Sequence, residues 1–352
     1  MSEFYSNEKL LSMKDRSGNV PELYIVCSRV RGPGKTFSFT KKLFDDFQND
    51  GSKFVLLCRT KSELGHIAEG MMKGMLNVKY PGWSVYEKVM MKGCYSMIMA
   101  TYGKNEEKIT SHCGYVIPLN SADMIKKISS MFVDATQGYM DEFQPEDART
   151  YLPNEVDKFL SVHGSIARGD GESRRHFPIY MSSNTISIIN PYFVELGLTN
   201  KIQENTKFYR GEGFVFERCT SEGLAKKHAE SGMSRAFSKN RSIQYQDNSW
   251  LNNSKALIAK PNDWGRCSYV CTIEYNNNVF ALKYYPKINL LYMDHNVDKS
   301  CKQRYSLTID NELNYPLLKT AAFAKMIRDA MELGNIRFSD QVCKQVALEM
   351  FI

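Results

Sequence analysis

Short apolar runs alternate with an amphipathic stretch in the N-terminal part of the chain. Runs of β-branched and aromatic residues, typical of buried strands, occur at Tyr24–Val26, Phe54–Cys58, 114–120 and 177–184. Between the first two runs, Phe37, Leu43, Phe44 and Phe47 recur on roughly one face of a helix that ends near Gly51. Strands and helices in this order predict an α/β fold with a mainly parallel sheet.

The pattern changes after residue 205. Residues 206–250 are basic, and their pattern predicts short helices, which together indicate a linker. From residue 251, strands separated by Asn-Asn-Asn and Tyr-Pro-Lys turns predict a meander of at least three strands. Two helices follow over 316–333 and 339–351, the second capped by Ser339. The chain is thus expected to divide into 1–205, 206–250 and a smaller α+β domain over 251–352.

Composition narrows the class of protein. A chain of 352 residues is longer than most single hydrophobic cores, which stop growing at about 250 to 300 residues. No apolar run approaches the roughly 18 residues of a membrane helix, and the polar N-terminus lacks a secretory signal, so we expect a cytoplasmic protein. Nine irregularly spaced cysteines indicate free thiols without zinc-site spacing. The net charge of +7 suits a polyanionic partner.

A glycine-rich segment, "CSRVRGPGKTFSF", joins the first strand to the first helix. Glycines allow backbone N–H groups to face a phosphate, and the helix N-terminus adds a partial positive charge. Lys35 would then reach the β- and γ-phosphates of ATP, and the Thr36 hydroxyl would bind Mg²⁺. The candidate cofactor-binding residues are Arg31, Gly32, Pro33, Gly34, Lys35, Thr36 and Phe37. The alternative is a purely structural turn.

A nucleotide loop requires acidic partners at the end of another strand. Tyr139 and Met140 lead into Asp141 and Glu142, which we expect to bind the metal ion and to act as general base for the attacking water, respectively. Asp134 is the competing candidate, and a solvated acidic turn is the alternative to both. At the end of the strand over 177–184, Asn184 could sense hydrolysis, although an asparagine there is more often a turn residue.

The motifs "RGPGKT", "LLCRTKSEL", "VIPLNSADMIKK", "MDEF", "SIARG" and "MSSNTISIINPYF" occur in this order. They resemble the DNA-packaging ATPases of small short-tailed phages, relatives of the terminase large subunits within the additional-strand, catalytic-glutamate group of P-loop motors. In that family the first glycine of the phosphate-binding (Walker A) loop is commonly replaced, as by Arg29 here. The resemblance implies a P-loop ATPase motor domain over 1–205, in which Lys35 and Glu142 are catalytic.

The resemblance also implies partners. It suggests a pentameric ring in which an arginine of the neighbouring subunit completes each site. Arg168 is our candidate for this role, with Arg174 and Arg175 as rivals in the same basic loop. Asn184 would lie in the segment that couples hydrolysis to movement. The implied partners are double-stranded DNA, the portal of the procapsid and a structural packaging RNA, at the portal vertex in the host cytoplasm.

For residues 251–352 the resemblance implies a degenerate RNase H-like domain that binds nucleic acid or the portal. An active nuclease would need several carboxylates on two metal ions. The candidates are Glu274, Asp294, Asp298, Asp310 and Glu312. Three functions therefore stay open: an ATP-driven DNA translocase, which the motifs favour, a terminase-type enzyme with an active C-terminal nuclease, and a nucleic-acid-binding assembly factor that does not hydrolyse nucleotide.

Overall fold

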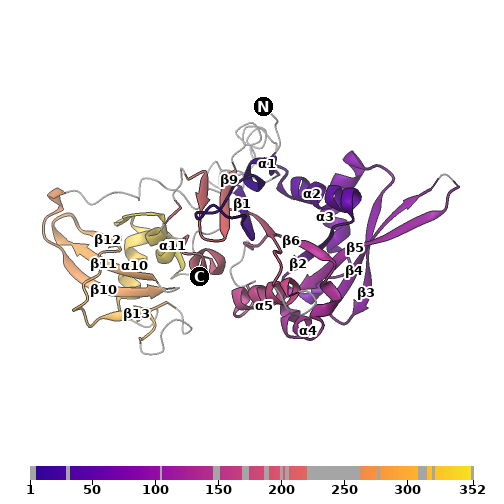
Figure 1. The fold of residues 1–352 in the computed structure, drawn as a ribbon. Helices are drawn as coiled ribbons and strands as arrows, with labels where there is room; N and C mark the ends of the chain where they lie inside the picture. The colour runs from indigo at the N-terminus through magenta and orange to yellow at the C-terminus, as the bar shows by residue number, and fades with distance from the viewer. Residues whose placement is uncertain are drawn as a thin grey trace. The chain divides into compact units, whose positions relative to one another are not determined.

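The computed structural model describes residues 5–28, 32–103, 105–145, 151–168, 174–185, 190–198, 201–202, 206–219, 262–275, 278–307, 315–318 and 322–349. They form two compact units, drawn in Figure 1. The first comprises Met1–Ile186 with Glu204–Asn248, and the second Ser187–Gln203 with Ser249–Ile352. No described helix is long and apolar enough to cross a membrane. All nine cysteines lie in the described residues, and none forms a disulfide.

The first unit contains a nine-stranded sheet in the order β3-β4-β5-β2-β6-β7-β1-β9-β8. The six central strands from β5 to β9 are parallel, and the strands outside them pair antiparallel. Its strands are β1 (Leu23–Ser28), β2 (Lys53–Cys58), β3 (Ser84–Met91), β4 (Cys94–Tyr102), β5 (Lys108–Pro118), β6 (Ala135–Asp141), β7 (Ile179–Asn184), β8 (Phe208–Arg210) and β9 (Phe214–Cys219). The predicted mainly parallel α/β fold is confirmed.

Helices cover both faces of this sheet. They are α1 (Glu8–Leu11), α2 (Lys35–Asp50), α3 (Ile67–Lys79), α4 (Ala122–Lys127) and α5 (Glu155–Ala167). Figure 1 shows α2 and α3 together on one face and α4 and α5 together on the other. A parallel sheet covered in this way buries both faces of its strands, which is why those strands read as continuous apolar runs.

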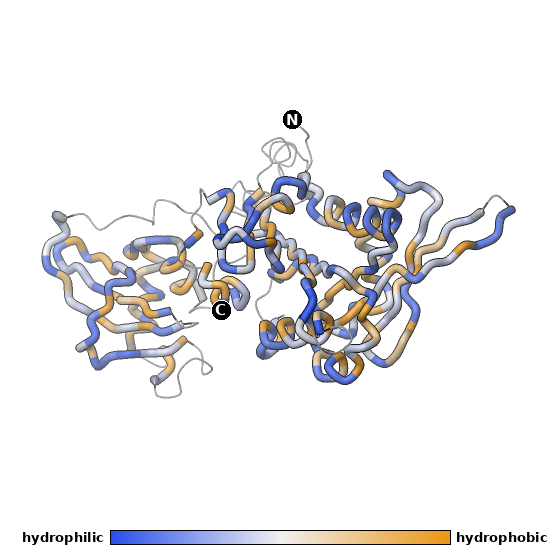
Figure 2. Tube along the Cα trace, in the orientation of Figure 1, coloured by the Kyte–Doolittle hydropathy of each residue, from blue (hydrophilic) through white to orange (hydrophobic). Residues whose placement is uncertain are grey.

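The core between the sheet and α2 follows from strand and helix periodicity. Phe54, Leu56 and Cys58 alternate along β2 toward this core, where they join Phe39 and the other buried residues of α2. The intervening residues of β2 are buried on the opposite face. Burying one such side chain stabilises the fold by about 1.5 to 3 kcal/mol. Figure 2 shows the result as apolar central strands beside a helix whose apolar and polar residues alternate.

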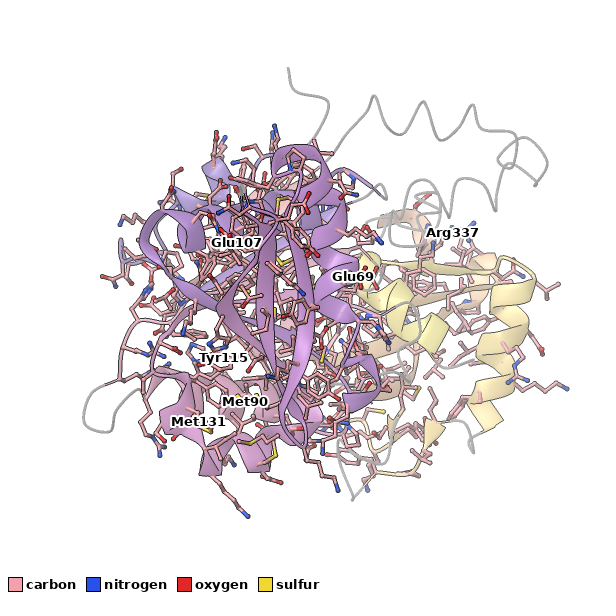
Figure 3. The ribbon with its side chains drawn as sticks, turned by 90° about the vertical axis from the view of Figure 1, so that its right-hand side faces the viewer. Glu69, Met90, Glu107, Tyr115, Met131 and Arg337 are labelled. Carbon is pink, nitrogen blue, oxygen red and sulfur yellow. The ribbon has the colours of Figure 1, made fainter. Side chains whose placement is uncertain are left out.

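Strands β3, β4 and the first part of β5 form an antiparallel extension that the sequence did not predict. β3 and the first part of β5 mix charged and apolar residues, and within β3 only Val85 is buried, so neither forms an apolar run. The turn between β3 and β4 and the turn between β4 and β5 lie at opposite ends of the strands, marked in Figure 3 by Met90 and Glu107. Continuous apolar runs indicate buried parallel strands, so they gave no signal for this antiparallel edge.

The second unit contains a five-stranded sheet in the order β13-β10-β11-β12-β14. Strands β10, β11 and β12 are antiparallel, as the predicted meander requires, and β13 and β14 pair parallel with β10 and β12. The elements are α6 (Pro191–Glu195), β10 (Ser268–Tyr275), β11 (Asn278–Tyr285), β12 (Leu290–Asp294), β13 (Arg304–Ser306), α10 (Ala322–Glu332), β14 (Ile336–Phe338) and α11 (Gln341–Glu349). The RNase H-like assignment stays a prediction.

Two expectations about segment boundaries need correction. The predicted linker over 206–250 begins with β8 and β9, which belong to the first sheet because β9 pairs in parallel with β1. The rest of that linker, from residue 220, lies outside the described residues. The cap of α11 is also not Ser339: the Asp340 carboxylate accepts the Cys343 N–H at 3.0 Å and so occupies the N-cap position.

Gly114 lies where β5 packs closely against Phe54 of β2. An added Cβ would lie 1.9 Å from the backbone carbonyl oxygen of Phe54, which cannot move without breaking the sheet. Gly114→Ala should lower the free energy of unfolding by more than about 2 kcal/mol. Gly74→Ala on α3, where an added Cβ meets nothing within 4 Å, should raise it by about 0.5 to 1 kcal/mol. Urea unfolding of both variants measures this, and equal midpoints would contradict the packing.

Candidate active site

The predicted site residues meet where three neighbouring parallel strands end. The loop after β1 leads to Lys35 and Thr36, β6 ends at Asp141, and β7 ends at Asn184. Ligand sites of open α/β sheets lie at this carboxyl edge. A pocket of about 320 Å³ opens there. It is lined by Gly32, Pro33, Gly34, Lys35, Thr36, Phe37, Asp141, Glu142, Ser183 and Asn184. Of the predicted cofactor-binding residues, Arg31 lies outside the described residues, as does Arg29.

The loop itself has the backbone that a phosphate cradle needs. Gly32 and Gly34 have φ values of 75° and 95°, in the left-handed region that glycine adopts without strain. Gly34 is the N-cap of α2, which begins at Lys35, so the helix N-terminus opens into the pocket. The N-terminal segment holds the loop from behind, because the Tyr5 N–H donates to the Pro33 carbonyl at 2.8 Å. Tyr5 had no signal in the sequence.

Lys35 is only 7% exposed, and oxygen atoms surround its ammonium group. Its Nζ donates to the Ser28 hydroxyl and, at 3.3 Å, to the Asn184 side-chain oxygen. Burial lowers the pKa of Lys35, while nearby acidic groups including Asp141 act against that shift. A buried cation held by neutral oxygens is prepared to pair with an anion that enters the pocket.

Thr36 and Asp141 form the second pair. The Thr36 hydroxyl donates to Asp141 Oδ2 at 2.6 Å, and the Ser182 hydroxyl donates to the other oxygen, Oδ1. The Ser182 hydroxyl also forms a hydrogen bond with the buried Tyr139 hydroxyl at 2.9 Å. A hydroxyl beside an oriented carboxylate is an all-oxygen donor set, which suits a hard cation such as Mg²⁺. These residues fit the predicted metal position.

Glu142 stands exposed at the mouth of the pocket with a strained backbone. Its φ is 49°, in the left-handed region. A non-glycine residue in this conformation raises the energy of the folded state by about 1 to 3 kcal/mol. Its N–H donates to Asp141 Oδ1 at 3.0 Å. The next residue, Phe143, is fully buried, and its N–H donates to the Ser182 carbonyl at 3.2 Å. Both neighbours thus hold the backbone at Glu142 in place.

A buried ion pair holds the chain after Glu142. Arg59 follows the last residue of β2 and donates to the Phe143 carbonyl at 2.9 Å. It also makes a bidentate ion pair with the Glu155 carboxylate, at 2.8 and 3.0 Å. Glu155 is the first residue of α5 and also accepts the Leu152 N–H at 2.8 Å. Arg59 directly follows the apolar run Phe54–Cys58 in the sequence, and its partner Glu155 lies too far along the chain for a local pattern to reveal the pair.

Asp134, the competing carboxylate, lies elsewhere. It precedes β6 and so belongs to the amino edge of the sheet, opposite the pocket. There it accepts hydrogen bonds from Lys53 at 2.6 Å and from the Tyr115 hydroxyl at 2.7 Å. Residues before it form a short 3₁₀ turn, Ser129–Phe132, and not the strand that its candidacy required. Asp141 and Glu142 are therefore the acidic residues beside Lys35.

The three arginines of the basic loop differ in their contacts. Arg175 donates to the Val133 and Phe132 carbonyls at 2.7 Å each, and Arg174 pairs with Glu22 at 3.1 Å. Arg168 follows the last residue of α5 and is exposed, and its side chain makes no hydrogen bond or ion pair within the described part of the chain. The contacts of Arg174 and Arg175, including the Arg175 N–H bond to the Ala167 carbonyl, put the end of α5 at the amino edge of the sheet, so Arg168 lies away from the pocket of its own subunit.

A family model described as Podovirus DNA encapsidation protein (Gp16) matches residues 1–352. The chain belongs to this family. The predicted resemblance is thereby confirmed. The DNA packaging protein of Bacillus phage B103 is 26% identical over 328 residues, covering 91% of this chain and 94% of the relative. That of Bacillus phage phi29 is 25% identical over 359 residues, covering 99% and 97%.

A solved structure of the bacteriophage phi29 viral genome packaging motor assembly also matches the chain. The match covers 99% of both chains, with a TM-score of 0.64 and 21% identity, and it shows that the two chains share a fold. Both units of this encapsidation protein are included in that match, because the coverage is almost complete.

The buried Arg59–Glu155 pair can be tested by neutralising one partner. Glu155→Gln should lower the free energy of unfolding by about 3 kcal/mol, because it removes one charge of a buried, hydrogen-bonded ion pair. Glu69→Gln, which breaks an exposed pair with Lys73 on α3, should change it by less than about 0.5 kcal/mol. Chemical unfolding of both variants gives the comparison. Equal effects would show that the Arg59–Glu155 contact is not structural.

Proposed function

We propose that this encapsidation protein hydrolyses ATP and uses the energy to move double-stranded DNA through the portal into a preformed procapsid. The observation that carries the proposal is the single pocket that gathers a glycine loop, Lys35, Thr36, Asp141 and Glu142. Each member of this set matches one requirement of phosphoryl transfer: a phosphate cradle, a metal site and a base for water.

The residues have distinct roles in this mechanism. The loop N–H groups and Lys35 bind and orient the phosphates of ATP, with Lys35 leaving Ser28 and Asn184 for the anion. Thr36 and Asp141 would hold Mg²⁺, which neutralises charge on the β- and γ-phosphates. Glu142 accepts a proton from the attacking water. Its exposed side chain, on a backbone held from both sides, is suited to a water molecule that reaches the pocket from outside.

Asn184 is the residue proposed to couple hydrolysis to movement. Its side-chain oxygen contacts both Lys35 Nζ, at 3.3 Å, and the Ser28 hydroxyl, at 3.2 Å. When Lys35 turns toward a phosphate, it must give up its bond to Asn184. The end of β7 would thereby change its hydrogen bonds with the nucleotide state, and the segment after β7 leads out of the first unit.

The proposal includes a pentameric ring in which Arg168 acts on the pocket of a neighbouring subunit. Support comes from its exposure and from its position at the sheet edge opposite its own pocket. An arginine supplied in trans makes hydrolysis in one subunit depend on the position of the next, which orders events around a ring. Arg174 and Arg175 are weaker candidates, because both are engaged within their own subunit.

The second unit is proposed to bind DNA, a structural RNA or the portal as a degenerate RNase H-like domain. The nuclease alternative is weakened by the contacts of its carboxylates: Asp294 binds Lys283 through both oxygens at 2.7 Å, and Glu274 lies 3.8 Å from Arg304. Asp298 is exposed and accepts from Ser300. Asp310 and Glu312 lie outside the described residues. Carboxylates already neutralised by cations are poor ligands for two metal ions.

Steady-state ATP hydrolysis, with and without double-stranded DNA, tests the proposed activity. We expect DNA to stimulate turnover, Lys35→Ala to abolish nucleotide binding and turnover, and Glu142→Gln to lower kcat by a factor of at least about 100 while nucleotide still binds. Asp134→Asn, a carboxylate outside the pocket, is the matched control and should keep activity. Nucleotide binding without turnover, even with DNA and portal present, would instead favour the assembly factor.

Mixed rings test the role of Arg168. Subunits with Arg168→Ala and subunits with Glu142→Gln should each be inactive alone, yet a mixture should regain part of the activity, because an intact arginine then meets an intact pocket at some interfaces. The same mixing experiment with Arg174→Ala subunits in place of the Arg168→Ala subunits is the comparison. If verified mixed rings show no recovery, Arg168 does not act in trans.

A further inference from the structure

Three potential metal ligands from distant parts of the chain meet in the second unit. They are His295, Asp340 and Cys343, whose ligand atoms all lie within 4.8 Å of one another. His295 follows β12, Asp340 follows β14, and Cys343 lies in the first turn of α11. They are separate from the pocket of the first unit and from the Lys283–Asp294 and Arg304–Glu274 pairs of the second. Nothing in the proposed packaging mechanism uses them.

The fold brings these residues together by strand register and helix periodicity. Strands β12 and β14 are parallel neighbours, with Met293 opposite Phe338. Two residues further along each strand the register reaches His295 and Asp340, which therefore lie side by side. Asp340 is the N-cap of α11, and Cys343 is three residues later, where a helix returns to the same face. The cluster is thus a consequence of the fold and not of one mobile side chain.

The distances between the ligand atoms are close to those of a tetrahedral metal site. His295 Nε2 lies 2.8 Å from Asp340 Oδ2, Cys343 Sγ lies 3.6 Å from that nitrogen, and Sγ lies 3.8 Å from that oxygen. Zinc bond lengths of about 2.0 to 2.3 Å with tetrahedral angles imply edges of about 3.3 to 3.6 Å between ligands. The sulfur–nitrogen distance lies in this range and the sulfur–oxygen distance of 3.8 Å is slightly longer. The nitrogen–oxygen distance is too short because a hydrogen bond joins those atoms, so a small rotation of His295 would be needed to lengthen it.

We propose that His295, Asp340 and Cys343 form a binding site for a zinc-like transition-metal ion. Thiolate, imidazole and carboxylate are a soft to borderline donor set, which selects Zn²⁺ over Mg²⁺. Asp340 would use one oxygen only, since its Oδ1 caps α11. His295 and Asp340 are 37% and 38% exposed, so water can take the fourth position, whereas Cys343 is fully buried.

Binding exchanges protons for the metal ion. The Cys343 thiol loses its proton, the proton shared between His295 Nε2 and Asp340 leaves that nitrogen, and three metal–ligand bonds form in their place. The Ser339 hydroxyl, 2.8 Å from Asp340 Oδ2 and 3.4 Å from Cys343 Sγ, can donate to either ligand and stabilise its negative charge. The ion would tie β12 to the start of α11 and so stabilise the second unit.

Sequence spacing could not have found this site. The nearest cysteine pair, Cys267 and Cys271, has no histidine or cysteine partner pair at zinc-site spacing, and the sequence therefore predicts no metal–thiolate site. A single cysteine here joins a histidine and an aspartate that only the pairing of β12 with β14 makes neighbours.

The test uses the full-length protein, stripped with a chelator and kept in excess Mg²⁺ so that hard-ligand sites are filled. Zn²⁺ titrated against a chromophoric chelator should bind with a stoichiometry of one per chain at this site. Cys343→Ser and His295→Gln should each weaken that binding at least tenfold. Asp340→Asn should weaken it too, and since asparagine is an equally good N-cap, its thermal midpoint in chelator should match the wild type.

Co²⁺ in place of Zn²⁺ supplies a readout that does not depend on activity. A thiolate-to-cobalt charge-transfer band should appear in the wild type, persist in a Cys267→Ser/Cys301→Ser control that removes the more accessible thiols, and vanish in Cys343→Ser. If Cys343→Ser does not fold, Asp340→Asn and His295→Gln still decide the matter. No band, a band unchanged by Cys343→Ser, or unchanged Zn²⁺ affinity in Asp340→Asn and His295→Gln would overturn the proposal and leave a capped helix beside an ion pair.

Discussion

The parallel pairing of β6, β7 and β1 is the constraint on which the candidate active site depends. In its register Ser28 lies opposite Asn184, and Asp141 lies opposite Ser182. These pairs supply the oxygen atoms that hold Lys35 and the hydroxyl that orients Asp141, the carboxylate proposed to bind the metal. A shift of one residue in either strand would turn those side chains to the other face of the sheet. The apolar residues buried on both faces fix this register, so the hydrophobic core and the chemistry of the pocket are specified together.

The backbone of Glu142 next to the pocket is strained. Its left-handed conformation is unfavourable by about 1 to 3 kcal/mol, and the structure maintains it through the buried Phe143 and the Arg59–Glu155 ion pair. A buried ion pair adds little net stability, because desolvation offsets most of the attraction between the charges. Its two-pronged geometry is instead suited to holding one backbone carbonyl in place. We therefore see the pair as a positioning device for the acidic residue next to the pocket.

Local patterns in the sequence were sufficient for the centre of the fold but not for its edges. The strand–glycine loop–helix unit and the apolar run before Asp141 have strong signals because buried parallel strands need continuous hydrophobicity. Strands β3, β4, β8 and β9 lacked that signal or lay in a segment interpreted as a linker. The choice between Asp134 and Asp141 was open in the sequence, since each carboxylate follows apolar residues, and only the strand boundaries place Asp141 at the pocket. The partners of Arg59 and Cys343 depend on long-range contacts, which no local pattern encodes.

The position of Arg168 has a consequence for assembly. Helix α5 begins beside Glu142, where Glu155 binds Arg59, and thirteen helical residues span about 20 Å before Arg168 follows at the opposite edge of the sheet. A residue so placed can complete a pocket only if the amino edge of one subunit faces the carboxyl edge of the next. That contact joins two different surfaces, and such head-to-tail contacts generate closed rings or open helices, not two-fold dimers. The proposed arginine in trans therefore agrees with the proposed ring, because a contact between opposite sheet edges can repeat from subunit to subunit until it closes.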